Sequence, residues 1–366
     1  MSNPARNPIG RRAFLRGGLT VTAAGALGLA DPLLAGATES GQLAPAIHGT
    51  GAWGARPAKG AISVLNSRPV KIIVHHTATA NVTDYSLARA FALSRSIQNY
   101  HMDSNGWIDT GQHFTNSRGG HITEGRHRSL AALNGGTQHV VSAHTSGQNN
   151  VALGIENEGL YTSVGPTTAQ WNSLVALCRY MCQQYRIAAS QIYGHRDFNN
   201  TACPGNVLYG RLPELRRAVA AAMGERERIV DPVTWPLLQP GDRGEKVLVA
   251  QRLLHHAGER GVPLDGVFDP RTDEAARRLE TRIGVAETGL VGAESWPALI
   301  PAALRKGDRN DAVHGVQLLL LAKGLRTPAD GEYTGATETA VREFQTGNQL
   351  PATGVADQLT WQYLLR

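Results

Sequence analysis

The chain has 366 residues, of which 42% are hydrophobic and 18% charged, with a formal net charge of +6. A single hydrophobic core stops growing at roughly 250–300 residues, so this length predicts two or three domains. The composition is that of folded, soluble protein and does not favour long disorder. No apolar run reaches the roughly 18 residues that a membrane span requires, so we expect no stable membrane insertion.

The N-terminal segment, residues 1–37, has the order of an export signal. The charged stretch "GRRAFLRGG" precedes the short apolar run "LTVTAAGALGLA" and the small-x-small sequence Ala35–Ala37. Its Arg11–Arg12 pair, followed by Phe14 and Leu15, resembles the twin-arginine class of bacterial signal. The alternative is an amphipathic first helix, which the many glycines disfavour. We expect cleavage after Ala37 and a secreted or cell-wall location.

Removal of this segment changes the charge argument. The segment carries a net charge of +3, so the mature chain keeps about half of the +6. No basic cluster stands out elsewhere, and nucleic acid is therefore not an expected partner. A mildly anionic surface remains compatible with the remaining charge.

The first strong strand pattern is "VKIIVHHTATA", residues 70–80. Its β-branched run predicts a buried strand. Because side chains alternate along a strand, His75 and His76 point to opposite faces, and one of them can face a cleft. Alternation alone does not choose between them. A hydrogen-bonded structural histidine is the alternative for either one.

The next elements predict a mixed sheet with helices packed against it. A helix is expected over "DYSLARAFALSRSIQNYHM", with Asp84 near its cap and Leu87, Phe91 and Ile97 among its inward positions. Short strands are expected near 109–115, 120–124 and 151–158, and helices near 167–185 and 207–223. Layers of this kind bring strand ends and loops together at one cleft.

The strand "VALGIENEG" offers a carboxylate to that cleft. Alternation places Ala152, Gly154, Glu156 and Glu158 on one face, so two small residues precede Glu156. A carboxylate on the floor of a cleft can act as a general acid or base. The alternative is a solvated strand carboxylate.

The three cysteines have two different surroundings. Cys178 and Cys182 lie in a helical pattern with Leu174, Leu177 and Met181, which favours packing in the core over a disulfide bridge. Cys203 is left unpaired, eight residues after His195, in the loop "GHRDFNNTACPG".

A metal ion explains Cys203. Zinc prefers thiolate and imidazole ligands, and a catalytic zinc site has three protein ligands and one open position. His195 and Cys203 would be two of these ligands, and a histidine of the first strand is the best candidate for the third.

The last third of the chain contains a duplication. "LLQPGDRGEKVLVAQRLL" aligns with "ALRKGDRNDAVHGVQLLL", and "TGLVGAESWPAL" aligns with "TGVADQLTWQYL", at an offset of 66 and then 65 residues. Apolar positions recur at helical spacing in both copies. We predict two small helical domains, 233–300 and 302–366, after a linker, "ERERIVDPVTWP".

The motifs "WGARP", "IIVHHTAT", "IQNYHMDSNGWIDTGQHF", "AHTSGQNNVALGIENEG" and "GHRDFNNTACPG" occur in this order over residues 50–225. Together they resemble the type 2 N-acetylmuramoyl-L-alanine amidases and the related peptidoglycan recognition proteins. The resemblance implies zinc as cofactor, held by His75, His195 and Cys203, and it is what favours His75 over His76.

The resemblance also implies roles for four other residues. Many recognition-type amidases have a tyrosine where this chain has Gln112, which cannot act as a base and is assigned to substrate binding. Glu156 matches the acid/base of the wall-recycling branch of the family. Thr201 matches an oxyanion donor, although a loop threonine is as often a turn residue. His144 matches a substrate-binding histidine of the cleft wall, with a structural histidine as the alternative.

The duplicated domains resemble the peptidoglycan-binding domain 1 family. The second copy keeps "VREFQ" where the first has "ARRLE", so ligand binding is less supported for the first copy. The whole pattern predicts a secreted, monomeric zinc amidase that cleaves the bond between N-acetylmuramic acid and L-alanine in peptidoglycan. A non-catalytic peptidoglycan-binding protein and a zinc peptidase acting on the stem peptide are the alternatives.

Overall fold

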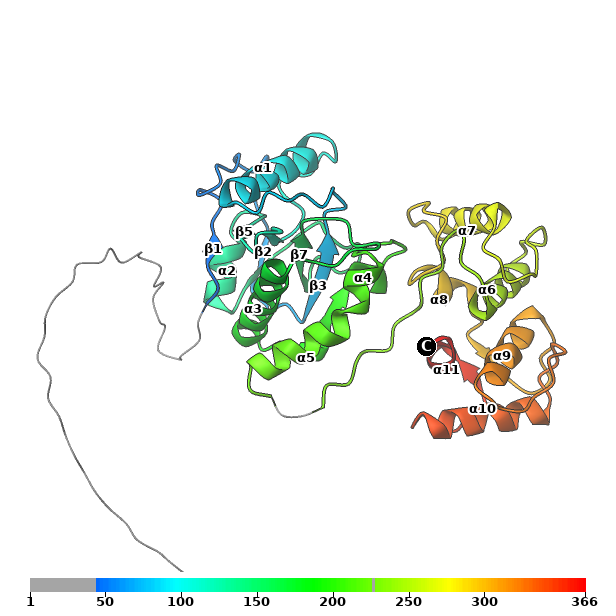
Figure 1. Ribbon diagram of the computed structural model, residues 1–366. Helices are drawn as coiled ribbons and strands as arrows, with labels where there is room; N and C mark the ends of the chain where they lie inside the picture. Colours follow the sequence, from blue (N-terminus) through cyan, green and yellow to red (C-terminus); the bar gives the residue numbers. More distant parts are fainter. Residues whose placement is uncertain (1–43, 226–227) are drawn as a thin grey trace, which may run out of the picture. The chain divides into compact units, whose positions relative to one another are not determined.

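The computed structural model describes residues 44–225 and 228–366 (Figure 1). The predicted twin-arginine signal, residues 1–37, lies outside the described residues. Residues 44–225 form the α/β region, and its main sheet has six strands in the order β1-β5-β4-β7-β3-β8. These strands are β1 (Ile47–His48), β5 (Ile122–Glu124), β4 (Phe114–Asn116), β7 (Ala152–Asn157), β3 (Lys71–His76) and β8 (Ile192–Gly194). A small second sheet pairs β2 (Val64–Leu65) with β6 (His139–Val140).

The centre of the sheet follows from strand alternation. Strands β3 and β7 are parallel, and His75 lies opposite Glu156 in their register. On one face, their apolar residues pack into the core under the helices, namely Ile72, Val74, Leu153 and Ile155. The other face carries the two polar residues of the predicted cleft, as alternation requires.

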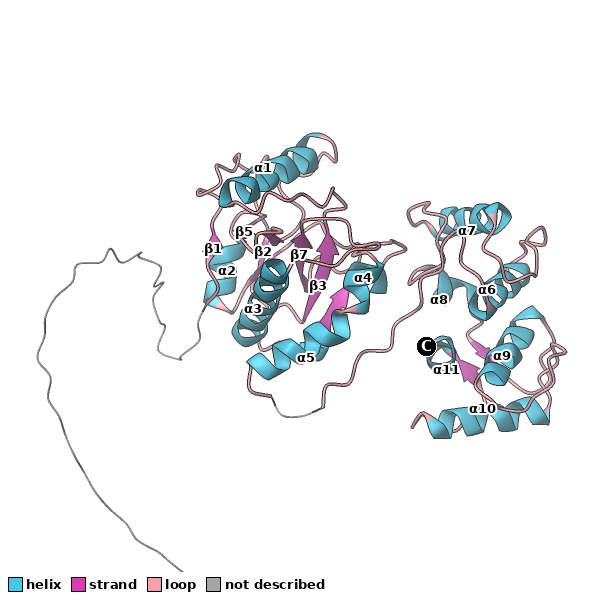
Figure 2. Cartoon of the chain, in the orientation of Figure 1, coloured by secondary structure: helices cyan, strands magenta, loops and turns pink. Residues whose placement is uncertain are grey.

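Helices surround this sheet (Figure 2). Helix α1 (Leu87–Asp103) is capped by the side chain of Ser86, and Asp84, predicted near the cap, accepts a hydrogen bond from the Ser86 backbone N–H. Helix α3 (Thr168–Tyr185) packs against α5 (Leu212–Ala222) and α2 (Ser129–Gly135). The helix predicted near 207–223 is two helices, because α4 (Asn206–Gly210) ends before α5 begins.

The structure confirms the prediction for the cysteines of α3. Cys178 and Cys182 are free thiols in the same buried cluster as Leu174, Leu177 and Met181. Burial raises the pKa of Cys182 to about 12, which keeps the thiol protonated and unreactive. The described residues contain no helix with both the length and the apolar character needed to cross a membrane.

In the C-terminal region, helices recur in the order that the duplication predicts. The first repeat contains α6 (Glu245–His256), α7 (Pro270–Ile283) and α8 (Ser295–Leu299). The second contains α9 (Asp311–Ala322), α10 (Gly335–Gly347) and α11 (Gln358–Leu365). Strand β9 (Ala303–Leu304) at the junction pairs with β10 (Ala356–Asp357). Equivalent glutamines, Gln251 and Gln317, accept hydrogen bonds from the backbone N–H groups of Gly266 and Gly331.

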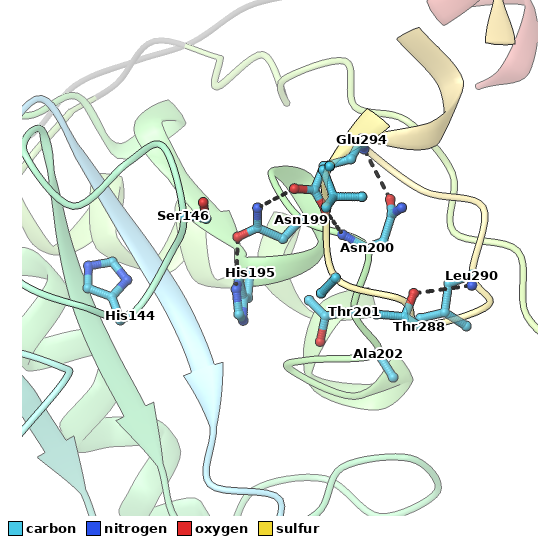
Figure 3. A pocket seen from close by; sticks show the side chains of 13 residues that line it. His144, Ser146, His195, Asn199, Asn200, Thr201, Ala202, Thr288, Leu290 and Glu294 are labelled. Carbon is cyan, nitrogen blue, oxygen red and sulfur yellow. Dashed lines mark hydrogen bonds between the residues drawn. The ribbon is translucent and has the colours of Figure 1, made fainter. Parts of the chain in front are cut away.

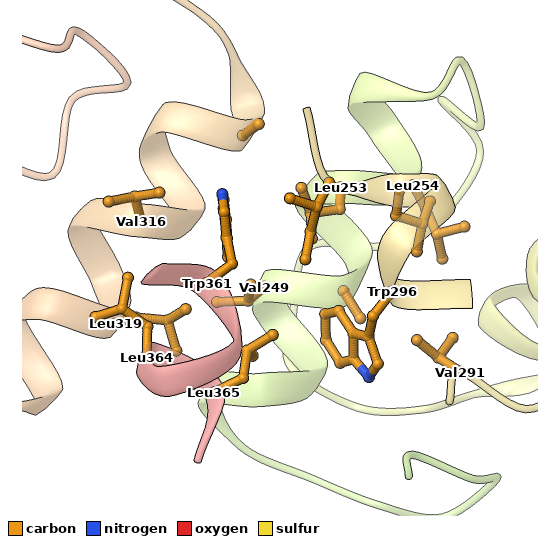
Figure 4. Packing of buried hydrophobic residues seen from close by; sticks show 14 of the residues in the cluster. Val249, Leu253, Leu254, Val291, Trp296, Val316, Leu319, Trp361, Leu364 and Leu365 are labelled. Atoms are coloured by element: carbon orange, nitrogen blue, oxygen red, sulfur yellow. The ribbon is translucent and has the colours of Figure 1, made fainter. Parts of the chain in front are cut away.

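The two repeats do not have separate cores. Helices α6 and α9 pack against each other, and the buried residues of both repeats form one cluster that includes Trp296 and Trp361 (Figure 4). A Cβ at Gly315 would lie 3.2 Å from the Trp361 ring and 3.5 Å from Val249, so the glycine permits this close approach. The prediction of two small three-helix domains is therefore not confirmed.

The predicted linker is held at both ends. The carboxylate of Asp231 forms an ion pair with Arg216 of α5 at 2.8 Å, and Thr234 bonds the hydroxyl of Tyr209 at 3.1 Å. Trp235 is buried in the core of the repeats. The described part of this segment is thus packed against both regions.

Candidate active site

The metal-ligand candidates begin with His75 at the carboxyl end of β3. Its side chain is buried, and its Nε2 lies 3.0 Å from Nδ1 of His144 and 3.3 Å from the hydroxyl of Thr145. Its Nδ1 faces Cys203, 3.8 Å from the Sγ atom. The neighbouring His76 contributes its backbone N–H to the same Sγ at 3.3 Å.

His195 follows directly after strand β8, which has only three residues and was not predicted from the sequence. Parallel pairing of β8 with β3 brings this histidine to the same sheet edge as His75, with ring centroids 4.4 Å apart. The carboxylate of Asp197 accepts a hydrogen bond from the Gly194 backbone N–H at 2.8 Å, which fixes the turn. The loop then returns so that the Sγ atom of Cys203 lies 3.8 Å from Nδ1 of His75.

The three predicted ligands converge. One ligand atom each from His75, His195 and Cys203 lies within 4.8 Å of the other two. Each imidazole also has a protein partner on its outer nitrogen: His144 for His75, and Asn199, whose Oδ1 lies 3.1 Å from His195 Nε2. Such partners fix the orientation of metal-binding histidines in proteins and leave the other nitrogen for the metal.

The electrostatics of the group fit a divalent cation. Burial, followed by the charge of His195, holds the pKa of His75 well below its ordinary value. Burial lowers the pKa of His195 to about 4, opposed by the bond to Asn199. Burial raises the pKa of Cys203 to about 12, partly opposed by the His76 N–H. Two neutral imidazoles and a thiol that needs a cation to ionise are a zinc-binding donor set.

Glu156 lies on β7 directly opposite His75. Its side chain keeps partial exposure to the cleft, and loss of hydration raises the pKa of its carboxyl group to about 8. Gly154, one of the small residues before Glu156, leaves room for another side chain, because a Cβ there would come within 2.5 Å of the His144 ring. Glycine therefore allows His144 to reach across β7 and contact His75.

His144 has both ring nitrogens engaged. Its Nε2 lies 3.3 Å from the carbonyl oxygen of Ala152, and its Nδ1 contacts His75 and Thr145. In the tautomer with the proton on Nε2, Nδ1 of His144 accepts a hydrogen bond from His75 Nε2–H, so Nδ1 of His75 is unprotonated. The geometry makes His144 a positioning residue for a metal ligand, while its predicted contact with substrate stays a prediction.

Two cavities meet at this site. One, of about 300 Å³, contains the ligand group and Glu156, and is lined by His75, His76, Ala78, His101, Trp107, Gly111, His144, Glu156, His195, Thr201 and Cys203. A second, of about 590 Å³, shares His144, His195 and Thr201 with the first (Figure 3). The remaining wall of the second cavity is formed largely by the first helical repeat.

Gln112 does not line either cavity. Its side chain is fully buried, and its Nε2 donates a hydrogen bond to the hydroxyl of Thr115 at 2.8 Å. The neighbouring Gly111 lines the cavity of about 300 Å³ instead, and both residues precede strand β4. The structure thus gives no surface through which Gln112 could bind substrate.

Thr201 faces the site. It lines both cavities, and its hydroxyl oxygen accepts a hydrogen bond from the Cys203 backbone N–H at 3.1 Å. This leaves the hydroxyl proton free to donate. His101 and Trp107, with ring centroids 4.7 Å apart, were missed as cavity residues because both stand in a helix-to-turn segment without metal spacing.

Two known protein families match parts of the chain. The profile of the N-acetylmuramoyl-L-alanine amidase family matches residues 65–206, and a peptidoglycan-binding domain profile matches residues 309–364, within the second repeat. Peptidoglycan-recognition protein SC2 of Drosophila melanogaster is 31% identical over 163 residues, which are 44% of this chain and 80% of that protein. The chain belongs to the N-acetylmuramoyl-L-alanine amidase family.

Other relatives of the family differ more in length. The N-acetylmuramoyl-L-alanine amidase of Homo sapiens is 33% identical over 171 residues, and the chain spans about 28% of its length. Among solved structures, peptidoglycan recognition protein LE in complex with tracheal cytotoxin is 29% identical, with 46% of this chain and 92% of that chain covered and a TM-score of 0.40. The endolysin amidase LysCS of Clostridium intestinale is 26% identical, with 51% and 100% covered and a TM-score of 0.38.

Proposed function

We propose that the protein is a zinc-dependent N-acetylmuramoyl-L-alanine amidase. It would hydrolyse the amide bond between the lactyl group of N-acetylmuramic acid and the L-alanine of the stem peptide. The observation that carries this proposal is the convergence of His75, His195 and Cys203 within 4.8 Å, in a cavity that also contains Glu156. Membership of an amidase family supports the reaction class.

The donor set determines what the metal contributes. Zinc bound by two imidazoles and a thiolate supplies Lewis acidity that polarises an amide carbonyl and makes water easier to deprotonate. His144 and Asn199 keep the two imidazoles in the orientation and tautomer that binding requires. The remaining steps belong to side chains of the cavity.

Glu156 transfers the proton. It accepts a proton from the attacking water, and it gives that proton to the amide nitrogen as the carbon–nitrogen bond breaks. The products are the lactyl carboxylic acid and a peptide with a free L-alanine amine. A carboxyl group whose pKa is raised to about 8 can both release and accept a proton near neutral pH.

Thr201 stabilises the developing charge. Its oxygen is already fixed by the Cys203 N–H, so its own proton can point to the carbonyl oxygen of the substrate. A donor positioned before the reaction favours the transition state over the ground state.

The product pattern tests this function. Purified peptidoglycan is digested with the zinc-loaded protein, and the soluble products are analysed by mass spectrometry. The proposal predicts free stem peptides that begin with L-alanine. Cleaved cross-links would instead indicate a peptidase, and the absence of products from a protein that retains peptidoglycan would indicate a non-catalytic binding protein.

The proposal includes a place and an anchor for the enzyme. Export by the twin-arginine route, followed by cleavage after Ala37, would bring the enzyme to the cell wall. The second repeat, matched by the peptidoglycan-binding profile, would raise the local concentration of an insoluble substrate by tethering. Fractionation of cells that express the full chain and an Arg11→Lys, Arg12→Lys variant checks the export route, since the variant should stay inside the cytoplasm.

A further inference from the structure

One buried position at which the two repeats differ concerns the catalytic region. In the second repeat, Gln345 is buried and makes its hydrogen bonds within its own repeat. Its Nε2 donates to the hydroxyl of Thr360 at 3.0 Å and to the carbonyl oxygen of Val355 at 2.9 Å, and its Oε1 accepts from Gly354 N–H at 2.9 Å. Every polar atom of this side chain therefore has a partner within the repeat.

The first repeat has Glu280 at the equivalent position, 65 residues earlier. Its carboxylate accepts from the backbone N–H groups of Thr288 and Gly289, both at 2.7 Å. A carboxylate has no N–H to donate, so the donor role of the glutamine is lost. Asn200 of the α/β region supplies this donor: its Nδ2 bonds Glu280 at 3.0 Å and Ser295, the counterpart of Thr360, at 2.7 Å.

Two further differences between the repeats surround the same asparagine. Gly292 stands where the second repeat has Asp357, and a Cβ at Gly292 would lie 2.9 Å from the Asn200 Oδ1. Glu294 stands where the second repeat has the exposed Leu359. Glu294 accepts from the Asn200 backbone N–H at 2.8 Å and donates its own N–H to the Asn200 Oδ1 at 3.0 Å. Asn200 is only 2% exposed as a result.

The neighbouring Asn199 connects this contact with the metal-ligand group. Its Nδ2 donates to Glu294 Oε1 at 3.0 Å, and its Oδ1 lies 3.1 Å from Nε2 of His195 (Figure 3). A continuous hydrogen-bonded chain thus runs from the first repeat to a ligand candidate. Beside it, Val285, Thr288 and Leu290 of the first repeat line the cavity of about 590 Å³ that His195 and Thr201 line from the other side.

We propose that the first repeat forms a fixed side of the substrate cleft rather than an anchor that binds the cell wall. Its Glu294 acts as a positioning residue, through Asn199, for His195. Its loop 285–290 contacts the part of the muropeptide that extends beyond the scissile amide, and this part of the inference rests on the proposed function. The duplication thus produced one anchoring copy and one copy that completes the active site.

Two variants of the full-length protein test the contact between the first repeat and the α/β region. Asn200→Asp places a carboxylate beside Glu280 and removes the Nδ2 donor, and Glu294→Leu copies the second repeat. Both should increase hydrogen exchange over residues 195–201 and 285–290 and enlarge the radius of gyration in small-angle scattering. Adding Glu280→Gln to Asn200→Asp returns a donor to the interface and should reverse both changes. Leu359→Ala, at the matching position of the second repeat, is the control and should change neither.

A second readout tests the positioning role. On a soluble muramyl peptide, which needs no anchoring, kcat/KM should fall about tenfold in Glu294→Leu, as loss of hydrogen bonds to a charged group implies. The visible spectrum of the cobalt-substituted protein should also change, because His195 loses its orientation. Unchanged hydrogen exchange and scattering in both variants would overturn the contact between the first repeat and the α/β region. An unchanged kcat/KM and cobalt spectrum in a variant that has lost this contact would overturn the role of the first repeat in the substrate cleft. A wild-type protein without amidase activity would contradict the proposed function, but it would leave the exchange, scattering and cobalt tests intact.

Discussion

Buried polar side chains are treated in opposite ways in the two regions of the molecule. In the helical region, Gln317 is fully buried, and its side-chain amide makes its hydrogen bonds with groups of its own repeat. In the α/β region, His75 and His195 each have one nitrogen held by a protein partner and the other left for the cavity. A buried side chain whose polar atoms are all hydrogen-bonded stabilises the fold. A buried histidine with one nitrogen held by a protein group and the other unbonded can bind an ion.

The largest expected effect is the loss of zinc and activity on substitution of a metal-ligand candidate, compared with a buried side chain of the core. Cys203→Ser removes the thiolate of the metal group, and zinc content and amidase activity should both fall below detection, because two imidazoles alone hold zinc weakly. Metal analysis by mass spectrometry and the digestion assay measure this. Cys178→Ser, in the core of α3, is the matched control and should keep its zinc. A Cys203→Ser protein with full zinc and activity would contradict the assignment.

Glu156→Gln should have the next largest effect. It removes the proton-transfer group but keeps the shape of the side chain, so kcat should fall by roughly 10²- to 10⁴-fold. Zinc content and the melting temperature should stay near the wild-type values, since the neutral amide avoids the cost of burying a charge. Steady-state kinetics on a soluble muramyl peptide gives the result. A wild-type kcat would remove Glu156 from the mechanism.

Lower pH should destabilise the fold through His113, a buried histidine that has structural partners only. Its Nδ1 accepts a hydrogen bond from Gly154 N–H at 2.9 Å, and burial lowers its pKa to about 3. Between the unfolded pKa of about 6.5 and the folded value, only the unfolded chain binds the proton, so stability falls as the pH falls. The melting temperature of the metal-free protein should therefore decrease from pH 6.5 toward pH 4. His113→Gln should flatten part of this decrease, and an unchanged profile in that variant would contradict the role of His113.

The smallest expected effect is confined to the helical region. Gln317→Met leaves the backbone N–H of Gly331 without its partner, at a cost of about 1–3 kcal/mol in the free energy of unfolding. Activity on a soluble muramyl peptide should not change. Chemical denaturation and the kinetic assay check the two statements separately. Loss of activity without loss of stability would break the distinction between the two regions.

The sequence predicted those parts of the site that depend on local patterns. Strand alternation placed Glu156 on the cleft face, and helical spacing placed Cys178 and Cys182 in the core. Alternation did not choose between His75 and His76, and the resemblance to the amidase family was needed for that choice. His195 and Cys203 in one loop predicted two ligands of a metal site, and the resemblance to the amidase family supplied His75 as the third.

Other features depend on contacts between distant residues. Strand β8 is too short for a periodic pattern, and its position comes from pairing with β3. The role of His144 follows from the missing Cβ at Gly154, and the partner of Glu280 lies 80 residues away in Asn200. Within the repeats, the glutamate in "ARRLE" was interpreted as weakened ligand binding, whereas in the structure it binds the α/β region.

The central claim is that His75, His195 and Cys203 bind one zinc ion. Anomalous diffraction at the zinc absorption edge, from crystals of the purified full-length protein, tests it most directly. The account predicts one strong peak at bonding distance from two imidazole nitrogens and the Cys203 sulfur, in the cavity that holds Glu156. A zinc peak elsewhere in the protein, with these three side chains unbound, would contradict it.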